Sequence, residues 1–167
     1  PQHDWKISDQ FWQQFLYSTS LGEKCSPWEN WSLDCISSVS DKTQIIRTPI
    51  EKIIVTSTSH IPLLELLGKE KTLVGFPNTN FISSPKTRKL IDAGFVKEVG
   101  KEEHINTEIL LDLAPELVMS FAVDKPNKSF ATIQKMKIPV LLNGDWLEKT
   151  PLARAEWIKV FGALYNE

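Results

Sequence analysis

Short apolar runs, each followed by a polar string and then by a helix-like stretch, recur four times along this chain. The polar strings are residues 57–60 (STSH), 77–80 (PNTN), 120–124 (SFAVD) and 143–146 (NGDW). Short apolar runs are typical of parallel strands buried on both faces, and parallel strands need crossover connections. Ligands on open α/β sheets gather outside the carboxyl ends of the strands. The pattern therefore predicts a parallel sheet with a binding site along one edge.

The composition narrows the class of protein. With 167 residues, of which 41% are hydrophobic and 24% charged, the chain suits one ordinary globular domain, and two full domains would be crowded. A net charge of -2 gives no electrostatic support for nucleic-acid binding, which requires clustered Lys and Arg, so we expect no nucleic-acid partner. No apolar run approaches the roughly 18 residues of a membrane-spanning helix.

Residues 1–44 differ from the remainder and are predicted to form an aromatic-rich amino-terminal extension. Four of the six tryptophans lie there, and Ser8 is placed to cap a helix that runs to Tyr17. The aromatic side chains either pack onto the main domain or form an exposed contact surface.

The two cysteines, Cys25 and Cys35, also lie in this extension. Their spacing matches no metal motif. In an oxidising compartment they could close a disulfide ring, and two free thiols are an equal alternative.

From residue 45 the pattern becomes regular and predicts an α/β lobe over 45–149. Ile53, Ile54 and Val55 form a β-branched run that suits a buried strand. The predicted strands are 52–56, 72–76, 95–99, 117–121 and 140–142. The first predicted helix has Pro62 in its first turn and ends at Gly68. The other predicted helices are 85–93, 107–113 and 127–137, with Ser84 and Asn106 as N-caps. Alternating strands and helices make right-handed crossovers the default, so the predicted fold class is α/β, with a three-layer, doubly wound, mostly parallel sheet.

The last segment, 150–167, is predicted as the start of a further helix. Thr150 is a suitable N-cap, Pro151 occupies the first helical position, and apolar residues line one face as far as Leu164. The apolar pattern is still running at Glu167, so we expect one helix that continues beyond the given residues. We expect its apolar face to be exposed.

The usual catalytic and phosphate-binding motifs do not occur in the sequence. No Gly-x-Gly-x-x-Gly follows the first strand, and no Gly-x-x-x-x-Gly-Lys-Ser/Thr is present. A Gly-x-Ser-x-Gly nucleophile motif is also missing. These features favour binding over catalysis.

Two candidate site residues are a histidine and a tryptophan that follow strands. His60 could be a hydrogen-bonded structural residue, a ligand contact or a metal ligand. Trp146, beside Asp145, could form a wall for a flat ligand or pack against the helix that begins at Thr150.

The remaining candidates at strand ends are small polar residues. Thr58 and Ser59 offer hydroxyls to a polar ligand and could equally cap the following helix. Asn78 could contact a ligand, but Pro-Asn is also a turn signal. Glu108 lies in the first turn after Asn106, where a carboxylate interacts favourably with the helix dipole.

Several segments taken together resemble a known family. They are residues 53–60, 66–68, 74–77, 106–118 and 138–140. They resemble the amino-terminal lobe of ABC-importer substrate-binding proteins of the iron-siderophore and cobalamin type, over about residues 45–167. The most specific element is 106–118, which combines a short helix, a Pro stop and a buried strand.

The resemblance implies a function without catalysis. Such proteins have two α/β lobes joined by one long helix, with the ligand between the lobes, so this chain would carry one lobe and the start of that helix. They are periplasmic or lipid-anchored, and they deliver an iron chelate, haem or corrinoid to an inner-membrane ABC permease. No resident cofactor or bound metal is expected. A single lobe encloses only half of a ligand, and we expect it to bind weakly alone.

The resemblance also implies roles for particular residues. A carboxylate on each lobe docks into the permease, and Glu108 is the matching residue here. The ligand-facing loops follow the strands, and the implied ligand contacts are Thr58, Ser59, His60, Asn78, Phe121, Asp145 and Trp146.

Two functions of other classes are alternatives. One is a metal-assisted hydrolase on a doubly wound sheet that uses His60 and Asp145. The other is an interaction module in which the aromatic residues of 1–44 bind another protein.

Overall fold

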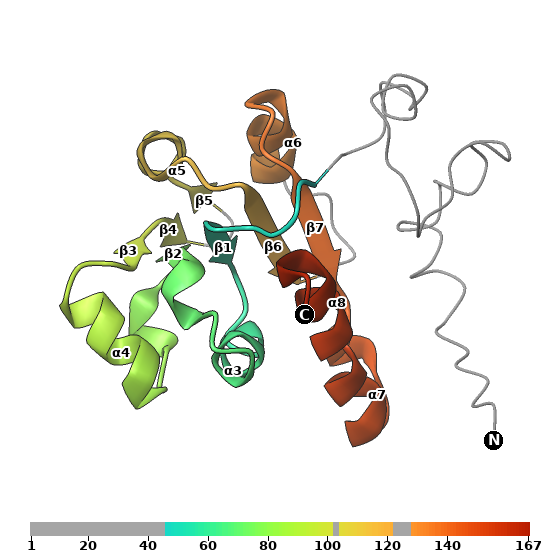
Figure 1. Ribbon diagram of the computed structural model, residues 1–167. Helices are drawn as coiled ribbons and strands as arrows, with labels where there is room; N and C mark the ends of the chain where they lie inside the picture. Colours follow the sequence, from blue (N-terminus) through green and yellow to red (C-terminus); the bar gives the residue numbers. More distant parts are fainter. Residues whose placement is uncertain (1–45, 102–103, 122–127) are drawn as a thin grey trace, which may run out of the picture. The chain divides into compact units, whose positions relative to one another are not determined.

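A central parallel sheet organises the part of the chain that the computed structural model describes, residues 46–101, 104–121 and 128–167 (Figure 1). Its strand order is β3-β2-β1-β6-β7. The strands are β1 (Ile53–Val55), β2 (Leu73–Phe76), β3 (Lys97–Glu98), β6 (Leu117–Phe121) and β7 (Val140–Asn143). A short antiparallel pair is formed by β4 (Gly100–Lys101) and β5 (His104–Ile105). All pairings in the large sheet are parallel, which confirms the prediction.

Helices alternate with these strands along the chain. They are α3 (His60–Leu66), α4 (Pro85–Asp92), α5 (Thr107–Leu113), α6 (Lys128–Lys135), α7 (Pro151–Glu156) and α8 (Ile158–Tyr165). Single 3-10 turns are η1 (Glu70–Thr72), η2 (Thr79–Phe81) and η3 (Asp145–Leu147).

The side chains of β1 point alternately into two apolar layers. Ile54 joins Val118 of β6 and residues of α5 and α6 in one buried cluster, which fills one face of the sheet. Neighbouring side chains of a strand point to opposite faces, so Ile53 and Val55 point into the other layer. There α3 and α8 lie in contact (Figure 1). The predicted three-layer, doubly wound α/β fold is therefore confirmed.

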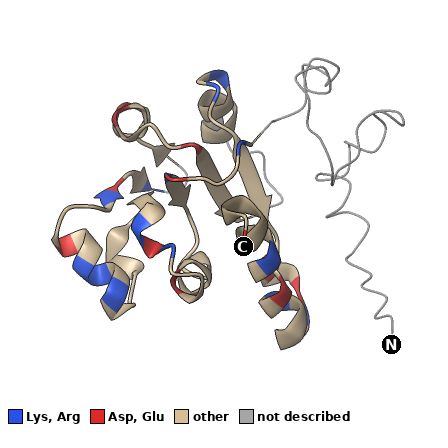
Figure 2. Cartoon of the chain, viewed as in Figure 1, with Lys and Arg blue, Asp and Glu red and all other residues tan. Residues whose placement is uncertain are grey.

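Charged residues lie on the helices and loops that surround the four central strands (Figure 2). The strands β1, β2, β6 and β7 contain no charged residue, whereas the helices and loops around them do. Burial of an unpaired charge is costly, so this distribution is the one that a sheet covered on both faces requires.

The N-caps predicted from the sequence are confirmed. Ser84, Asn106 and Thr150 each accept a backbone N–H from the first turn of the helix they begin, at 3.2, 3.0 and 3.2 Å. A side-chain acceptor at this position satisfies a donor that the helix itself leaves without a partner.

One predicted strand is shorter in the structure. The strand predicted over 95–99 is reduced to β3, because the N–H groups of Phe95 and Val96 donate to the carbonyl of Leu90 at the end of α4. The helix predicted to have Pro62 in its first turn is confirmed, and it begins at His60. The predicted helix over 8–17 and both cysteines lie outside the described residues.

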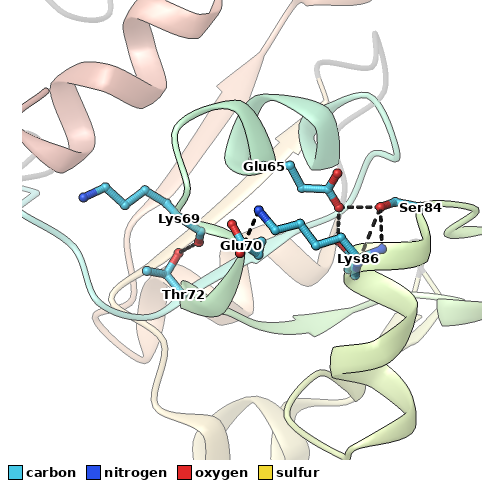
Figure 3. A network of polar contacts seen from close by, with 7 residues as sticks. Glu65, Lys69, Glu70, Thr72, Ser84 and Lys86 are labelled. Atoms are coloured by element: carbon cyan, nitrogen blue, oxygen red, sulfur yellow. Dashed lines mark hydrogen bonds and ion pairs between the residues drawn. The ribbon is translucent and has the colours of Figure 1, made fainter.

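A polar network joins α3 to α4 (Figure 3). The carboxylate of Glu65 accepts hydrogen bonds from Ser84 at 2.5 Å and from Thr87 at 2.6 Å. Lys86 forms an ion pair with Glu70 at 2.9 Å. Burial raises the pKa of Glu70, but the hydrogen bond and charge of Lys86, with further polar groups, outweigh it and lower the pKa below its usual value. The network fixes the start of α4 against α3.

The segment predicted as one helix with an exposed apolar face forms two helices. The break lies at Trp157, where successive hydrogen bonds tighten to a spacing of three residues. The apolar side of α8 is buried, including Phe161 and Leu164, so the prediction of an exposed face was wrong for α8. Asn166 takes a left-handed conformation directly after this helix.

Polar contacts hold α8 in this layer. The N–H of Ile50 donates to the carbonyl of Leu164 at 3.0 Å, and the hydroxyl groups of Tyr165 and Thr72 are 2.6 Å apart. The apolar pattern that suggested a longer exposed helix is therefore the pattern of a helix that packs on the sheet.

Replacing Gly75 with Ala is expected to destabilise the fold. A Cβ atom there would lie 2.7 Å from Cγ1 of Val99 and 3.2 Å from Cγ1 of Ile54, and both side chains are fully buried. We expect the free energy of unfolding to fall by about 1–3 kcal/mol, measured by urea denaturation. Gly144→Ala is the matched control, because its nearest atoms lie at 3.6 Å. An equal loss in the control would contradict this explanation.

Candidate functional site

The order of the strands defines where a ligand can bind. From β1 the chain builds outward through β2 and β3, then returns to the other side of β1 to form β6 and β7. The strand order therefore reverses between β1 and β6, and ligands of open α/β sheets bind outside the carboxyl ends of the strands at such a point. We call the ends of β1, β2, β6 and β7 and the loops that follow them the carboxyl edge.

The floor of this edge is a buried pair of hydroxyl groups. Oγ1 of Thr56, after β1, and Oγ of Ser120, in β6, are 3.0 Å apart. The N–H of Thr56 also donates to the carbonyl of Met119 at 3.0 Å. These two contacts extend the pairing of β1 with β6 by one residue and hold the strands together at the switch point.

The loop between β1 and α3 presents hydroxyl groups to solvent. Oγ of Ser57 and Oγ of Ser59 are 2.9 Å apart, and the N–H of Ser59 donates to Ser57 at 3.3 Å. Ser59 precedes α3 but makes no side-chain cap, so the capping alternative does not apply to it. Thr58 and Ser59 are both exposed, as a ligand contact requires.

The loop after β2 holds an aromatic ring outward. Asn78 has a left-handed backbone (φ 51°) that starts η2, which is the turn role expected of it. Arg88 of α4 donates from Nη1 to the carbonyl of Thr79 at 2.9 Å. Phe81, the last residue of η2, is 70% exposed.

The loop after β7 is built in a similar way. Oδ1 of Asn143 accepts the N–H of Asp145 at 2.8 Å, and Arg154 of α7 donates to the carbonyl of Trp146 at 3.4 Å. Trp146 is 48% exposed and Leu147 lies beside it in the same turn. An arginine from the following helix thus supports each of the two turns that carry an exposed aromatic side chain.

Two of the predicted contacts lie beneath the carboxyl edge and not on it. His60 is fully buried at the start of α3, and its ring lies 5.8 Å from that of Phe161 in α8. Asp145 is also buried. Both ring nitrogens of His60 and Oδ1 of Asp145 have no hydrogen-bond partner among the described residues. The structure therefore differs from the expectation that both side chains face a ligand.

Burial also sets the charge state of His60. It lowers the pKa of His60 to about 4, and the nearby charge of Asp145 opposes the shift only in part. The imidazole is therefore neutral at pH 7.

The remaining predicted residues lie at exposed or half-buried positions. Phe121 ends β6 and is half-buried, and residues 122–127 after it lie outside the described residues. Glu108 is exposed in the first turn of α5, where both the helix-dipole role and a docking role are open to it.

Sequence reasoning missed Phe81. The polar string 77–80 ends directly before this residue, and an aromatic side chain at that place was the available signal.

Neither a metal cluster nor a membrane-spanning helix is found in the described parts of the chain. Within residues 46–101, 104–121 and 128–167, no group of three or more His, Cys, Asp or Glu side chains could hold a metal ion. The helices of these same ranges are all too short or too polar to cross a membrane.

Comparison with known proteins identifies two relatives of similar sequence, and no family model matches. Two uncharacterized lipoproteins of Methanocaldococcus jannaschii are each 25% identical to this chain. The matches cover 93% and 74% of this chain, and 37% and 32% of the relatives. The chain thus spans about a third of the length of these relatives. Both relatives are named as lipoproteins, which agrees with the expected periplasmic or lipid-anchored location.

Solved structures of binding proteins share the fold. The petrobactin-binding protein YclQ of Bacillus subtilis is 18% identical, with a TM-score of 0.54 over 72% of this chain and 40% of its own. The periplasmic haem-binding protein HutB of Vibrio cholerae is 20% identical, with a TM-score of 0.51 over 68% and 42%. Helicobacter pylori CeuE, solved with Ni(II) bound, is 27% identical, with a TM-score of 0.54 over 72% and 39%.

These matches confirm the fold that the sequence resemblance implied. The described lobe corresponds to one lobe of a periplasmic binding protein, and it covers less than half of each matched chain.

Acid is expected to weaken the fold through His60. The pKa is about 4 in the folded protein and 6.5 for a free side chain, so between these values the unfolded chain binds a proton that the folded chain lacks. The free energy of unfolding therefore falls as the pH drops from 6.5 to about 4, by about 3 kcal/mol in total, and this contribution is constant at lower pH.

Urea denaturation at about pH 7 and about pH 4.5 measures this contribution. His60→Gln should reduce the pH dependence, whereas His104→Gln, at an exposed position, should leave it unchanged. Equal pH dependence in His60→Gln and the unchanged protein would contradict the expectation.

Proposed function

We propose that this chain is the ligand-binding lobe of an ABC-importer substrate-binding protein that captures an iron-siderophore, haem or cobalamin-like ligand and delivers it to the permease. The observation that carries the proposal is the carboxyl edge itself. Exposed hydroxyl groups at the topological switch point are flanked by two exposed aromatic side chains, on a fold shared with periplasmic binding proteins.

The positions of the two aromatic residues support a wide ligand. Phe81 follows β2 and Trp146 follows β7, and two strands, β1 and β6, lie between them. Three spacings of about 4.8 Å separate the flanking strands by roughly 14 Å. A compact solute would reach only one of the two rings, whereas a haem, a corrinoid or a bulky metal chelate would contact both.

The polar groups between the rings suit the heteroatoms of such a ligand. Thr58 and Ser59 offer hydroxyls as donors or acceptors, and Asn78 offers an amide. Phe121 lies at the end of the strand that borders the switch point. A binding site of this kind combines apolar walls with a few polar groups that orient the ligand.

The hydrolase alternative has less support. A general base must come within hydrogen-bond reach of the reacting group, but His60 is fully buried, as is most of Asp145. We therefore propose a binding function without catalysis, in which these two residues support the edge from beneath.

Ligand titrations of the full-length protein test this function. With haemin, cyanocobalamin and a ferric hydroxamate as probes, Phe81→Ala and Trp146→Ala should each weaken the tightest complex by about tenfold or more, because each removes an aromatic contact of about 1.5–3 kcal/mol. Isothermal titration calorimetry measures the affinity.

Phe95→Ala is the matched control. Phe95 is 69% exposed, close to the 70% of Phe81, but it precedes β3 and so lies at the opposite edge of the sheet. Its removal should leave affinity unchanged. If the folded protein binds none of the probes, the proposed ligand class is wrong.

Glu108 is the proposed permease contact on this lobe. Glu108→Ala should lower uptake of the bound ligand into cells several-fold and leave its affinity for the isolated protein unchanged. Asp112→Ala removes another exposed carboxylate from the same helix and should alter neither property. Equal uptake by both variants would contradict the docking role.

A further inference from the structure

Two buried side chains, at the starts of α3 and η3, carry polar atoms without a hydrogen-bond partner among the described residues. His60 is 0% exposed and Asp145 is 7% exposed. Neither ring nitrogen of His60 has a hydrogen-bond partner in the described part of the chain, and the same holds for Oδ1 of Asp145. The charge of Asp145 raises the pKa of His60, in opposition to burial, and the two side chains form no direct hydrogen bond with each other.

Burying these polar atoms without hydrogen bonds would lower the stability of the fold, so a hydrogen-bond partner for them is expected. Buried polar side chains in native proteins almost always have a partner, which is protein or ordered water. A direct ion pair would need a charged imidazole, whereas burial keeps this one neutral at pH 7. A structural metal site generally takes four ligands, and the described residues offer no third His, Cys, Asp or Glu to this pair. A buried water needs only two to four polar partners.

We propose that His60 and Asp145 form an internal binding site for water, in which a ring N–H of His60 donates to the water oxygen and the water donates to Oδ1 of Asp145. A carboxylate oxygen accepts hydrogen bonds, so the water donates to Asp145, and in the proposed tautomer the protonated ring nitrogen of His60 faces the water. The aromatic ring of Phe161 covers the imidazole from α8. Tyr165, further along α8, brings no charge, because burial raises its pKa to about 12.

The site has a positioning role at the carboxyl edge. His60 directly follows Ser59, and Asp145 directly precedes Trp146. A water bridge between the two buried side chains thus connects a loop after β1 to a loop after β7 from beneath. This inference concerns the support of the edge and does not depend on the identity or existence of a ligand.

Nitrogen-15 NMR of the histidines in the full chain tests the charge state. His60 should be neutral at pH 7, with one protonated ring nitrogen, and His60→Gln assigns its signals. In Asp145→Asn the midpoint of the His60 titration should move to lower pH, because the carboxylate charge that raises the pKa of His60 is gone. A charged His60 at pH 7 would overturn the water bridge in favour of a direct ion pair.

A high-resolution crystal structure tests the bridge itself. Electron density for a water within hydrogen-bond distance of a His60 nitrogen and of Oδ1 of Asp145 is the expected result. Asp145→Asn keeps an oxygen acceptor and should retain the water, whereas Asp145→Leu should lose it. If Asp145→Leu does not fold, the unchanged protein and Asp145→Asn still decide the question. A direct His60 to Asp145 contact, or a metal ion found by elemental analysis at this place, would overturn the proposal.

Discussion

The pairing of β1 with both β2 and β6 is the constraint on which the rest of the structure depends. Because β1 is central, its three side chains are buried from both faces, and helices must cover both sides of the sheet. The same pairing places the reversal of strand order between β1 and β6. The hydroxyl contact between Thr56 and Ser120 links the carboxyl ends of these two strands. The location of the candidate site therefore follows from one strand.

The parts of the fold that depend on local chemistry could be predicted from the sequence. Asn106 and Ser84 cap their helices because a side-chain oxygen next to a helix start has few better partners than the free N–H groups. The β-branched run in β1 is likewise a local signal. The strand after α4 was predicted too long because the left-handed Gly94 ends the helix in a local cap, in which Phe95 donates its N–H to the carbonyl of Leu90.

The features that could not be predicted are those that depend on which surfaces meet. The apolar pattern of α8 is the same whether the helix packs on its own lobe or on another, and tertiary contacts such as those of Leu164 with Ile50 and of Tyr165 with Thr72 decide between them. His60 was expected to face a ligand, but its side chain is buried beside Phe161 of α8, a helix that lies far along the chain. The exposure of Phe81 likewise depends on how η2 turns after Asn78.

The two turns of the carboxyl edge that carry exposed aromatic side chains are each held by a contact from the following helix. Each turn that carries an exposed aromatic side chain is tied at a backbone carbonyl by an arginine of the next helix, Arg88 for η2 and Arg154 for η3. An aromatic ring held in place loses little conformational freedom on binding, so more of its contact energy appears as affinity. The imidazole of His60 and the carboxylate of Asp145 are buried, whereas the rings of Phe81 and Trp146 are exposed at this edge. This division between buried ionisable groups and exposed aromatic rings favours recognition over reaction.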